Sequence, residues 1–289
     1  MSSFGELVTA VGRYVGRPDS VYAAHIKEAI NAALAQYTRE FSTPFTRRRL
    51  TLVTTGRTEE ALPQVVDRPV ALYDAYGNPL SCRPRDVEYQ YSGDPCWWSI
   101  AGVFPVKRHP EGALTIVSDS ASDARVVTLR GLLNGEPVRA ELTLNGTYVQ
   151  SVTSSFDEIH DFSVASKRDA TVVLADSETI GVIGPYQTAS RYVWIRLNPV
   201  PPSGTELTVV YIPCVVELVD DSDAVPSFVP RDYVYWSAVQ QLAADLDRGG
   251  LLQVATQELM RIVRGEAAKE NAYGDHDGWI TPSPEGTFE

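Results

Sequence analysis

The sequence predicts an α+β fold in which a helical bundle, formed from both chain ends, carries a long β insertion. Three observations support this. Apolar residues recur every three or four positions near both ends of the chain, which is typical of amphipathic helices. In the middle of the chain, apolar and polar residues alternate and β-branched residues are frequent, which predicts short strands. The stretch 191–231 then leads from alternating strands through an acidic loop into a helix that opens at Pro230.

The composition narrows the class of protein. The chain has 289 residues, 44% hydrophobic and 21% charged, enough for one large domain or two modest ones. A net charge of −12 argues against broad nucleic-acid binding, because phosphate contacts depend on Lys and Arg. We expect no membrane span and no secretory signal. The cysteines Cys82, Cys96 and Cys214 match no zinc or redox pattern, so we expect folding in a reducing cytoplasm.

Two helices are predicted at the start of the chain, within a bundle segment of residues 1–45. A short one covers about Phe4 to Val15, and a longer one covers about Ser20 to Phe41. Asp19 and Ser20 offer side-chain oxygens that can cap the longer helix.

The middle of the chain is predicted to be β-rich, with a β region at 46–120 and 185–224. A turn at 76–79 between strand-like flanks predicts a hairpin. Short strands and Asn-Gly turns predict an inserted sandwich at 121–184, in which we interpret 156–162 as helical or irregular.

Two further helices are predicted at 225–270, the first ended by Gly249 and Gly250. A short Gly loop between two helices predicts an antiparallel pair that completes the bundle.

The last segment, 271–289, is predicted to be an extended tail. Its last 18 residues hold four acids and no Lys or Arg, with no regular period. It also carries Tyr273, Trp279, Ile280 and Phe288, which are unusual in a solvating tail. We therefore predict that these four residues bind a neighbouring subunit.

Two acidic segments could hold a cation, but we favour a polar turn and a solvated loop. Asp275 to Gly278 resembles part of a calcium loop, although the later acidic ligands are missing. The second segment is a cluster formed by Glu217, Asp220, Asp221 and Asp223. We expect neither a metal nor a cofactor.

No catalytic frame is recognised, so we expect that the protein is not an enzyme. His160 and Asp161 lie near serines without a nucleophile elbow, and no Gly-rich phosphate loop is present. Asn145-Gly146-Thr147 matches a glycosylation sequon, but we interpret it first as a hairpin turn. The run Arg47, Arg48 and Arg49 is either a solvated strand start or an interface patch for an acidic neighbour.

The layout of the chain resembles the adaptor, or head-completion, proteins of the head-to-tail connector of tailed bacteriophages. Residues 21–52 resemble their opening helix and first strand, and residues 126–176 are similar to the immunoglobulin-like insertion of some members. The strands of 191–213, the acidic 220–226 and the helix 233–246 follow in the family's order. The resemblance is one of layout, without an invariant signature.

The resemblance implies a structural protein of the virion neck. Such adaptors form a twelve-fold ring beneath the portal that joins capsid to tail and continues the DNA channel used in genome ejection. Their partners are the portal, a tail or nozzle protein and copies of themselves, and their C-terminal tails often insert between portal subunits. DNA passes without specific binding, which an acidic channel wall would favour. No catalysis and no cofactor are implied.

Two other functions remain open. A carbohydrate- or surface-binding β-sandwich component of a phage tail would use exposed aromatic residues such as Trp97, Trp98 and Trp194. A hydrolase would have to combine the acidic cluster with His160. Helices at both chain ends favour the adaptor over a stalk.

Overall fold

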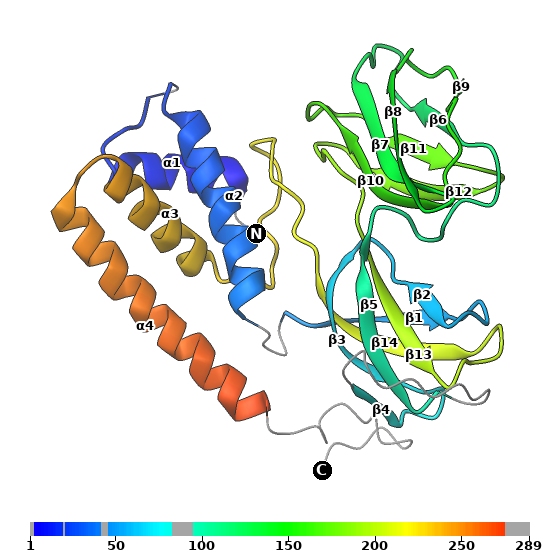
Figure 1. The fold of residues 1–289 in the computed structure, drawn as a ribbon. Helices are drawn as coiled ribbons and strands as arrows, with labels where there is room; N and C mark the ends of the chain where they lie inside the picture. Colours follow the sequence, from blue (N-terminus) through cyan, green and yellow to red (C-terminus); the bar gives the residue numbers. More distant parts are fainter. Residues whose placement is uncertain (1–2, 20, 42–45, 83–94, 275–289) are drawn as a thin grey trace. The chain divides into compact units, whose positions relative to one another are not determined.

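The predicted α+β class is confirmed. A computed structural model describes residues 3–19, 21–41, 46–82 and 95–274. Within them the order of elements is two helices, fourteen strands and two helices (Figure 1). The chain divides into two compact units, Met1–Arg49 with Val210–Glu289, and Leu50–Val209. In the described part of the chain no helix is long and apolar enough to cross a membrane.

The first unit holds α1 (Phe4–Tyr14) and α2 (Ala23–Glu40). A capping box begins α1, because the Ser3 hydroxyl and the Glu6 carboxylate each accept a bond from the other residue's backbone N–H. Helix α2 begins later than predicted. Asp19 Oδ1 accepts a hydrogen bond from the Tyr22 N–H at 2.9 Å, so Asp19 organises the turn that precedes the helix.

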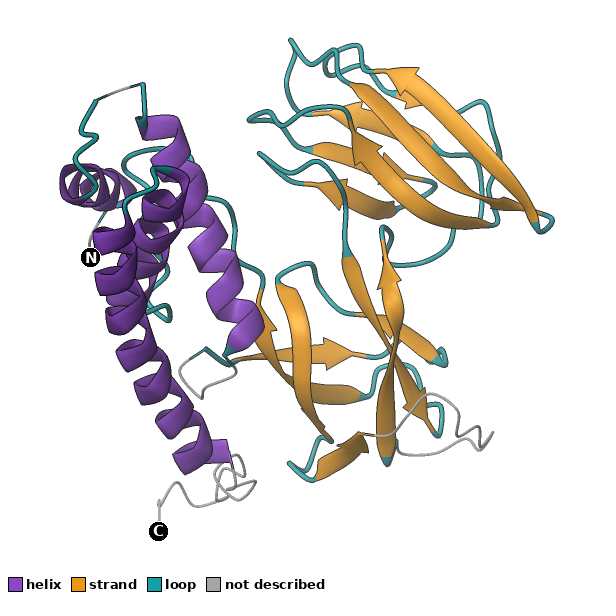
Figure 2. Cartoon of the chain, turned by 60° about the vertical axis from the view of Figure 1, so that its left-hand side comes forward, coloured by secondary structure: helices purple, strands orange, loops and turns teal. Residues whose placement is uncertain are grey.

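The same unit holds α3 (Arg231–Asp245) and α4 (Gly249–Gly274), which lie side by side (Figures 1 and 2). We predicted that Gly249 and Gly250 end the first of these helices, but they are the first two residues of α4. The left-handed residue of the turn is Asp247 (φ 52°), whose short polar side chain tolerates that conformation. The extended tail was predicted to start at residue 271, but residues 271–274 still belong to helix α4.

One hydrophobic core joins all four helices. Its largest fully buried side chains include Phe4, Leu34, Tyr37 and Tyr233, one or more from each of the helices α1, α2 and α3. Helix α4 contributes Ala255, with Leu259, Ile262 and Val263 partly buried against the core. The Tyr37 and Tyr233 rings meet edge to face at 5.0 Å between centroids.

The sheet with the most strands has seven, in the order β1-β14-β3-β4-β5-β13-β2. The predicted turn at 76–79 joins β3 and β4, with Leu72 opposite Leu80. Asp74 Oδ1 accepts bonds from the Tyr76 and Asn78 N–H groups, which fixes this turn. The strands are β1 (Arg48–Val53), β2 (Glu59–Ala61), β3 (Val66–Tyr73), β4 (Pro79–Cys82), β5 (Trp97–Phe104), β13 (Tyr192–Asn198) and β14 (Glu206–Pro213).

Two smaller sheets share a second hydrophobic core, and we call them together the two-sheet module. Their strand orders are β10-β7-β8 and β12-β11-β6-β9, and the strands are labelled in Figure 1. The core extends back to Val106, so β6 belongs to the module although it lies before the predicted boundary at residue 121. The strands are β6 (Thr115–Ser118), β7 (Val126–Leu133), β8 (Glu136–Thr143), β9 (Gln150–Ser151), β10 (Glu158–Val164), β11 (Val172–Ala175) and β12 (Thr179–Ile183).

Two local predictions in the module were wrong. The segment 156–162 is not helical or irregular, because most of it forms β10. A register shift between Ile159 and Asp161 brings Ile159 and Phe162 to the core at a three-residue spacing, which resembles a helical period. Asn145-Gly146 does not turn a hairpin, since β8 and β9 belong to different sheets. The hairpin turn is Asn134-Gly135 (φ 52° and 81°), between β7 and β8.

Candidate functional site

The predicted partner-binding residues are only partly described. Trp279, Ile280 and Phe288 lie outside the described residues, as does the calcium-like segment 275–278. Tyr273 lies in the last turn of α4. The run of arginines at 47–49 leads into β1, where the Arg48 guanidinium lies over the Phe228 ring at 5.3 Å. Arg48 also donates to the Arg47 carbonyl at 3.0 Å, so this side chain is held against its own unit.

The acidic loop 217–223 is fastened to the first two helices. Asp223 accepts bonds from the Val219 and Asp220 N–H groups at 2.7 and 2.9 Å. Asp221 pairs with Lys27 at 2.8 Å, and its carbonyl accepts the Gly5 N–H at the start of α1. The carboxylates of Asp221 and Asp223 are therefore engaged by other groups of the same chain. In the ranges that the structure describes, no three His, Cys, Asp or Glu side chains gather as a metal site would need.

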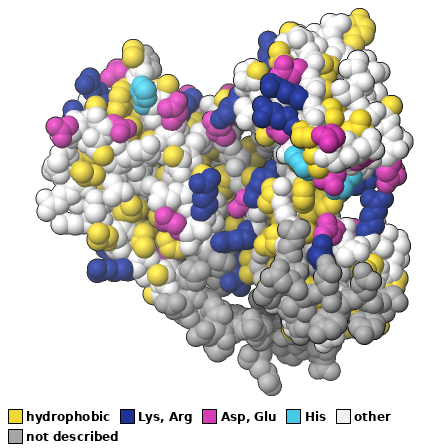
Figure 3. Space-filling view, in the orientation of Figure 1, with side chains coloured by type: hydrophobic (Ala, Val, Ile, Leu, Met, Phe, Trp, Pro, Cys, Tyr) yellow, Lys and Arg dark blue, Asp and Glu magenta, His cyan; other side chains and the backbone are white. Residues whose placement is uncertain are grey.

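His160 and Asp161 are not brought together. The structure places His160 Nε2 3.0 Å from Glu158, while Asp161 pairs weakly with Arg130 at 3.8 Å. Acidic and basic side chains are interspersed on the face shown in Figure 3.

The tryptophans that a carbohydrate-binding function would need at the surface are buried. Trp97, Trp98 and Trp194 keep 4, 2 and 6% of their surface accessible, so none offers a ring face as a binding platform. Trp194 donates its indole N–H to the Val106 carbonyl at 2.8 Å and packs against Phe104 and His109. This contact ties β13 to the first residue of the module core.

A cleft of about 1270 Å³ lies in the second unit, next to Trp97, Trp194 and His109. Charged side chains on its wall are largely paired with one another: Arg196 with Glu59 at 2.7 Å, and Arg57 with Glu111 at 2.8 Å. His109 Nδ1 is buried without a hydrogen-bond partner, and burial lowers the pKa of His109, which favours the neutral ring. The cleft therefore has a mixed wall of apolar side chains and paired charges, next to one unsatisfied nitrogen.

The wall of this cleft is held by a buried ion pair. Arg108 forms two parallel bonds to Asp176, at 2.6 and 2.8 Å. Burial opposes ionisation of Asp176, but backbone N–H groups of Glu111, Glu178 and Ser177 and the Arg108 side chain hold its pKa well below its usual range.

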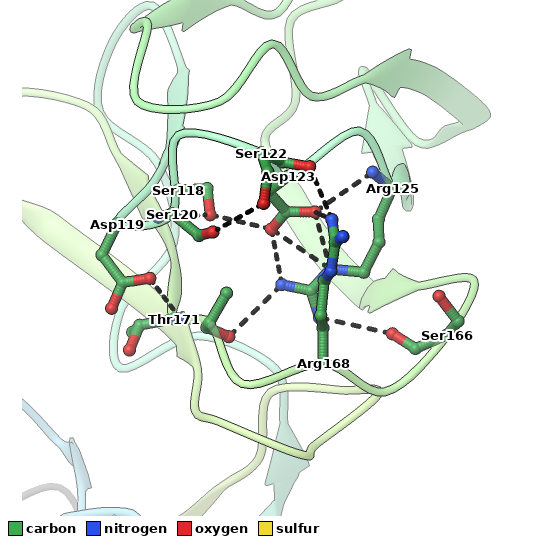
Figure 4. Close-up of polar contacts among 10 residues, drawn as sticks. Ser118, Asp119, Ser120, Ser122, Asp123, Arg125, Ser166, Arg168 and Thr171 are labelled. Atoms are coloured by element: carbon green, nitrogen blue, oxygen red, sulfur yellow. Dashed lines mark hydrogen bonds and ion pairs between the residues drawn. The ribbon is translucent and has the colours of Figure 1, made fainter.

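A second buried network lies inside the module (Figure 4). The Asp123 carboxylate accepts bonds from Arg125 Nη2 at 2.7 Å and from the Ser118 hydroxyl at 2.8 Å. Arg125 also donates to the Ser166 and Ala170 carbonyls, at 3.3 Å each. The Arg125 guanidinium, with help from Ser118 and the Arg125 backbone N–H, lowers the pKa of Asp123 to about 2 against burial, which opposes ionisation. Sequence reasoning missed this pair, whose only signal is one Asp two residues before an Arg at a strand start.

A cluster of aromatic rings on helices α1 and α3, which we call the aromatic patch, consists of Tyr14, Tyr235 and Trp236. The three rings meet edge to face at centroid distances of 5.9, 5.3 and 5.1 Å. Tyr14 is 38% exposed, and Tyr235 and Trp236 are half-buried. Tyr14 lies far from the other two residues in the sequence, and this surface cluster was not predicted from the sequence.

The sequence matches no protein-family model and no curated protein.

Proposed function

We propose that the protein is a structural adaptor of a phage neck, which forms a ring beneath the portal, joins capsid to tail and continues the DNA channel. One observation carries the proposal: helices from both ends of the chain share one core, while the β strands form an insertion between them. This is the arrangement that the resemblance to connector adaptors implies. The helical bundle would dock on the portal, and the β region would face the tail.

Further support comes from the contacts that join the two parts of the first unit, which we call the helical unit. The β insertion separates its two halves in sequence, and polar contacts lock them together. Asn31 makes two bonds of 2.9 Å to the Leu218 backbone, and Tyr37 donates to Glu266 at 3.0 Å inside the core. A rigid docking element with a long insertion suits a connector, which must present one surface to the portal and another to the tail.

The two-sheet module would be the inserted sandwich of such an adaptor. It has seven strands divided four and three, as in immunoglobulin constant domains. Its strand order differs from theirs. If β6 to β12 are lettered A to G, the sheets read G-F-A-D and E-B-C, whereas the constant-type domain has A, B, E and D in one sheet and C, F and G in the other. We therefore propose a sandwich in which strands A and D lie in the sheet of F and G, while strand C lies in the sheet of B and E.

The proposal is tested by mass photometry of the full chain, alone and mixed with the portal ring of the same phage. We expect complexes heavier than the portal by about twelve chains of 31.7 kDa. A portal whose mass is unchanged at micromolar concentrations of the chain would refute the proposal. Electron microscopy of the complex then shows which unit faces the portal.

The cleft favours a second candidate, a carbohydrate- or surface-binding component of a phage tail. Paired Arg and Glu side chains on its wall provide donors and acceptors of the kind that bind hydroxyl groups. The buried tryptophans weaken this candidate, because stacking on a sugar needs an accessible ring face. Binding of host-surface polysaccharide that disappears in Arg57→Ala and Glu111→Ala would support it.

A further inference from the structure

The aromatic patch has properties that its packing role does not use. The Tyr235 hydroxyl and the Trp236 indole N–H make no hydrogen bond to the described residues, and neither is a buried unpaired atom. These donors therefore reach solvent. The Tyr14 hydroxyl, on an exposed side chain, is likewise unbonded within the part of the chain described. Three unbonded donors thus stand on one cluster of aromatic rings.

Such a surface fits an extended segment that contains proline. Prolines hold a chain in the polyproline II conformation, which exposes its carbonyl oxygens and costs little entropy to bind. Tyrosine hydroxyls and tryptophan N–H groups can donate to those carbonyls while the rings pack on the proline faces. Burial, with Tyr14 nearby, raises the pKa of Tyr235, so its hydroxyl stays protonated and able to donate at neutral pH.

The chain itself contains a segment with a suitable composition. Residues 275–289 follow α4 and include Pro282 and Pro284, separated by one residue. The segment carries four acids and no Lys or Arg. Arg13 and Arg17 are exposed on either side of Tyr14 in the sequence, so the charges are complementary.

The reach of this segment favours a neighbouring copy over the same chain. Gln240 bonds Thr256 at 3.0 Å, which places Trp236, four residues earlier in the antiparallel pair, near the level of Met260. From Met260 to Gly274 helix α4 continues for about 21 Å. The eight residues to Pro282 span about 25 Å as polyproline II, yet they would have to reverse direction and also cross about 8 to 10 Å between helices. The same chain would need full extension without a turn, whereas a second copy has no such constraint.

We propose that the aromatic patch of one subunit binds the C-terminal segment 275–289 of a neighbouring copy, with Pro282 and Pro284 against Tyr14 and Trp236. This contact goes beyond the proposed function, because it requires two copies of the chain and no portal. Within a ring it would connect each subunit to the next.

The test uses the full chain with a photo-crosslinking amino acid, p-benzoylphenylalanine, in place of Trp236 or, in a second variant, of Tyr14. Nitrogen-14 and nitrogen-15 copies are mixed before illumination, and the crosslinked peptides are identified by mass spectrometry. We expect crosslinks to 275–289 that join one light and one heavy copy. Replacing both prolines by alanine should lower the crosslink yield about fivefold, which corresponds to about 1 kcal/mol.

A matched control carries the crosslinker at Val21, which is 85% exposed on the same unit and should give no crosslink to the segment. Circular dichroism confirms that each variant is folded. Crosslinks that never reach 275–289, that join residues of one copy only, or that persist unchanged without the prolines would each overturn the proposal. None of these outcomes bears on portal binding, which is measured separately.

Discussion

The helical unit and the two-sheet module close their cores in opposite ways. In the helical unit, Phe4 on α1 shares a core with Tyr233 on α3, more than two hundred residues later. In the module, all core residues lie between Val106 and Ile183, and the strands of its two sheets pair only with one another. The helical core therefore depends on two parts of the chain that lie far apart in the sequence. The module core is built from one continuous segment.

The two regions also bury carboxylates differently. In the module, Asp123 meets a cation, Arg125, and the carboxylate side chain has no exposed surface. In the helical unit, buried Glu266 accepts a bond from the neutral Tyr37 hydroxyl at 3.0 Å. A buried ion pair costs desolvation of both partners and tolerates the loss of neither. Loss of either partner of the Asp123–Arg125 pair should therefore destabilise the module strongly.

The largest effect is expected from removing one half of the helical core. Deletion of residues 1–42 removes Phe4, Leu34 and Tyr37, so α3 loses its packing against α1 and α2 and keeps only α4 as a neighbour. Helices of this length are marginal in water without tertiary packing, so α3 and α4 should unfold. Circular dichroism at 222 nm should then lose nearly all helical signal. A truncated chain that retained the helical signal of α3 and α4 would show that these helices do not depend on α1 and α2.

A smaller effect is expected from Asp123→Asn in the module. The substitution leaves Arg125 buried without its counter-ion, which should destabilise the module by about 3 kcal/mol. Thermal unfolding followed by near-ultraviolet circular dichroism measures this change. Asp119→Asn is the matched control, because Asp119 is exposed in the same loop and bonds only the Thr171 N–H. Equal losses in both variants would show that the ion pair has no special role.

The acid stability of the module should depend on the same carboxylate. The folded pKa of Asp123 is about 2 and its ordinary value is 3.8. A lowered pKa contributes stability that is complete above the ordinary value and is lost as the pH falls through the folded one. We expect a loss of roughly 2 kcal/mol between about pH 4 and pH 2. Urea titrations across this range measure it, and Asp123→Asn should remove this component of the acid dependence.

The sequence predicted the elements whose pattern is local. The period of α1 and the turn at 76–79 were correct, because helix amphipathicity and turn residues act within a few positions. Errors arose where a residue's role depends on distant strands. The bulge at Ile159 imitates a helical period, and Asn145-Gly146 and Asn134-Gly135 look alike until the sheets are known.

The candidate sites were harder to predict for the same reason. Asp123 and Arg125 are recognisable as a pair only once Ser166 and Ala170 close over the guanidinium. The aromatic patch joins Tyr14 to residues more than two hundred positions away. The carbohydrate-binding alternative would need Trp97, Trp98 and Trp194 at the surface, but all three are buried.

The smallest effect on the helices is expected from removing the module as a whole. Its two connections leave the sheet at adjacent positions, since Phe104 of β5 lies opposite Tyr192 of β13. Antiparallel partners lie about 5 Å apart, so a short Gly/Ser linker can replace residues 106–190 and close a hairpin. The boundary predicted at residue 121 would instead leave β6 behind without β11.

The sheet should lose only a few contacts in this variant. Trp194 loses its bond to Val106, Gln64 loses Val182 and Ser190, and Arg57 loses Glu111. None of these residues contributes to the helical core. We therefore expect a soluble chain whose helical signal at 222 nm per molecule is unchanged, with a melting temperature of the helices within a few degrees of the full chain. An insoluble product, or loss of the helical signal, would mean that the helices need the module to fold, and the contrast between a dependent core and a self-sufficient one would then be wrong.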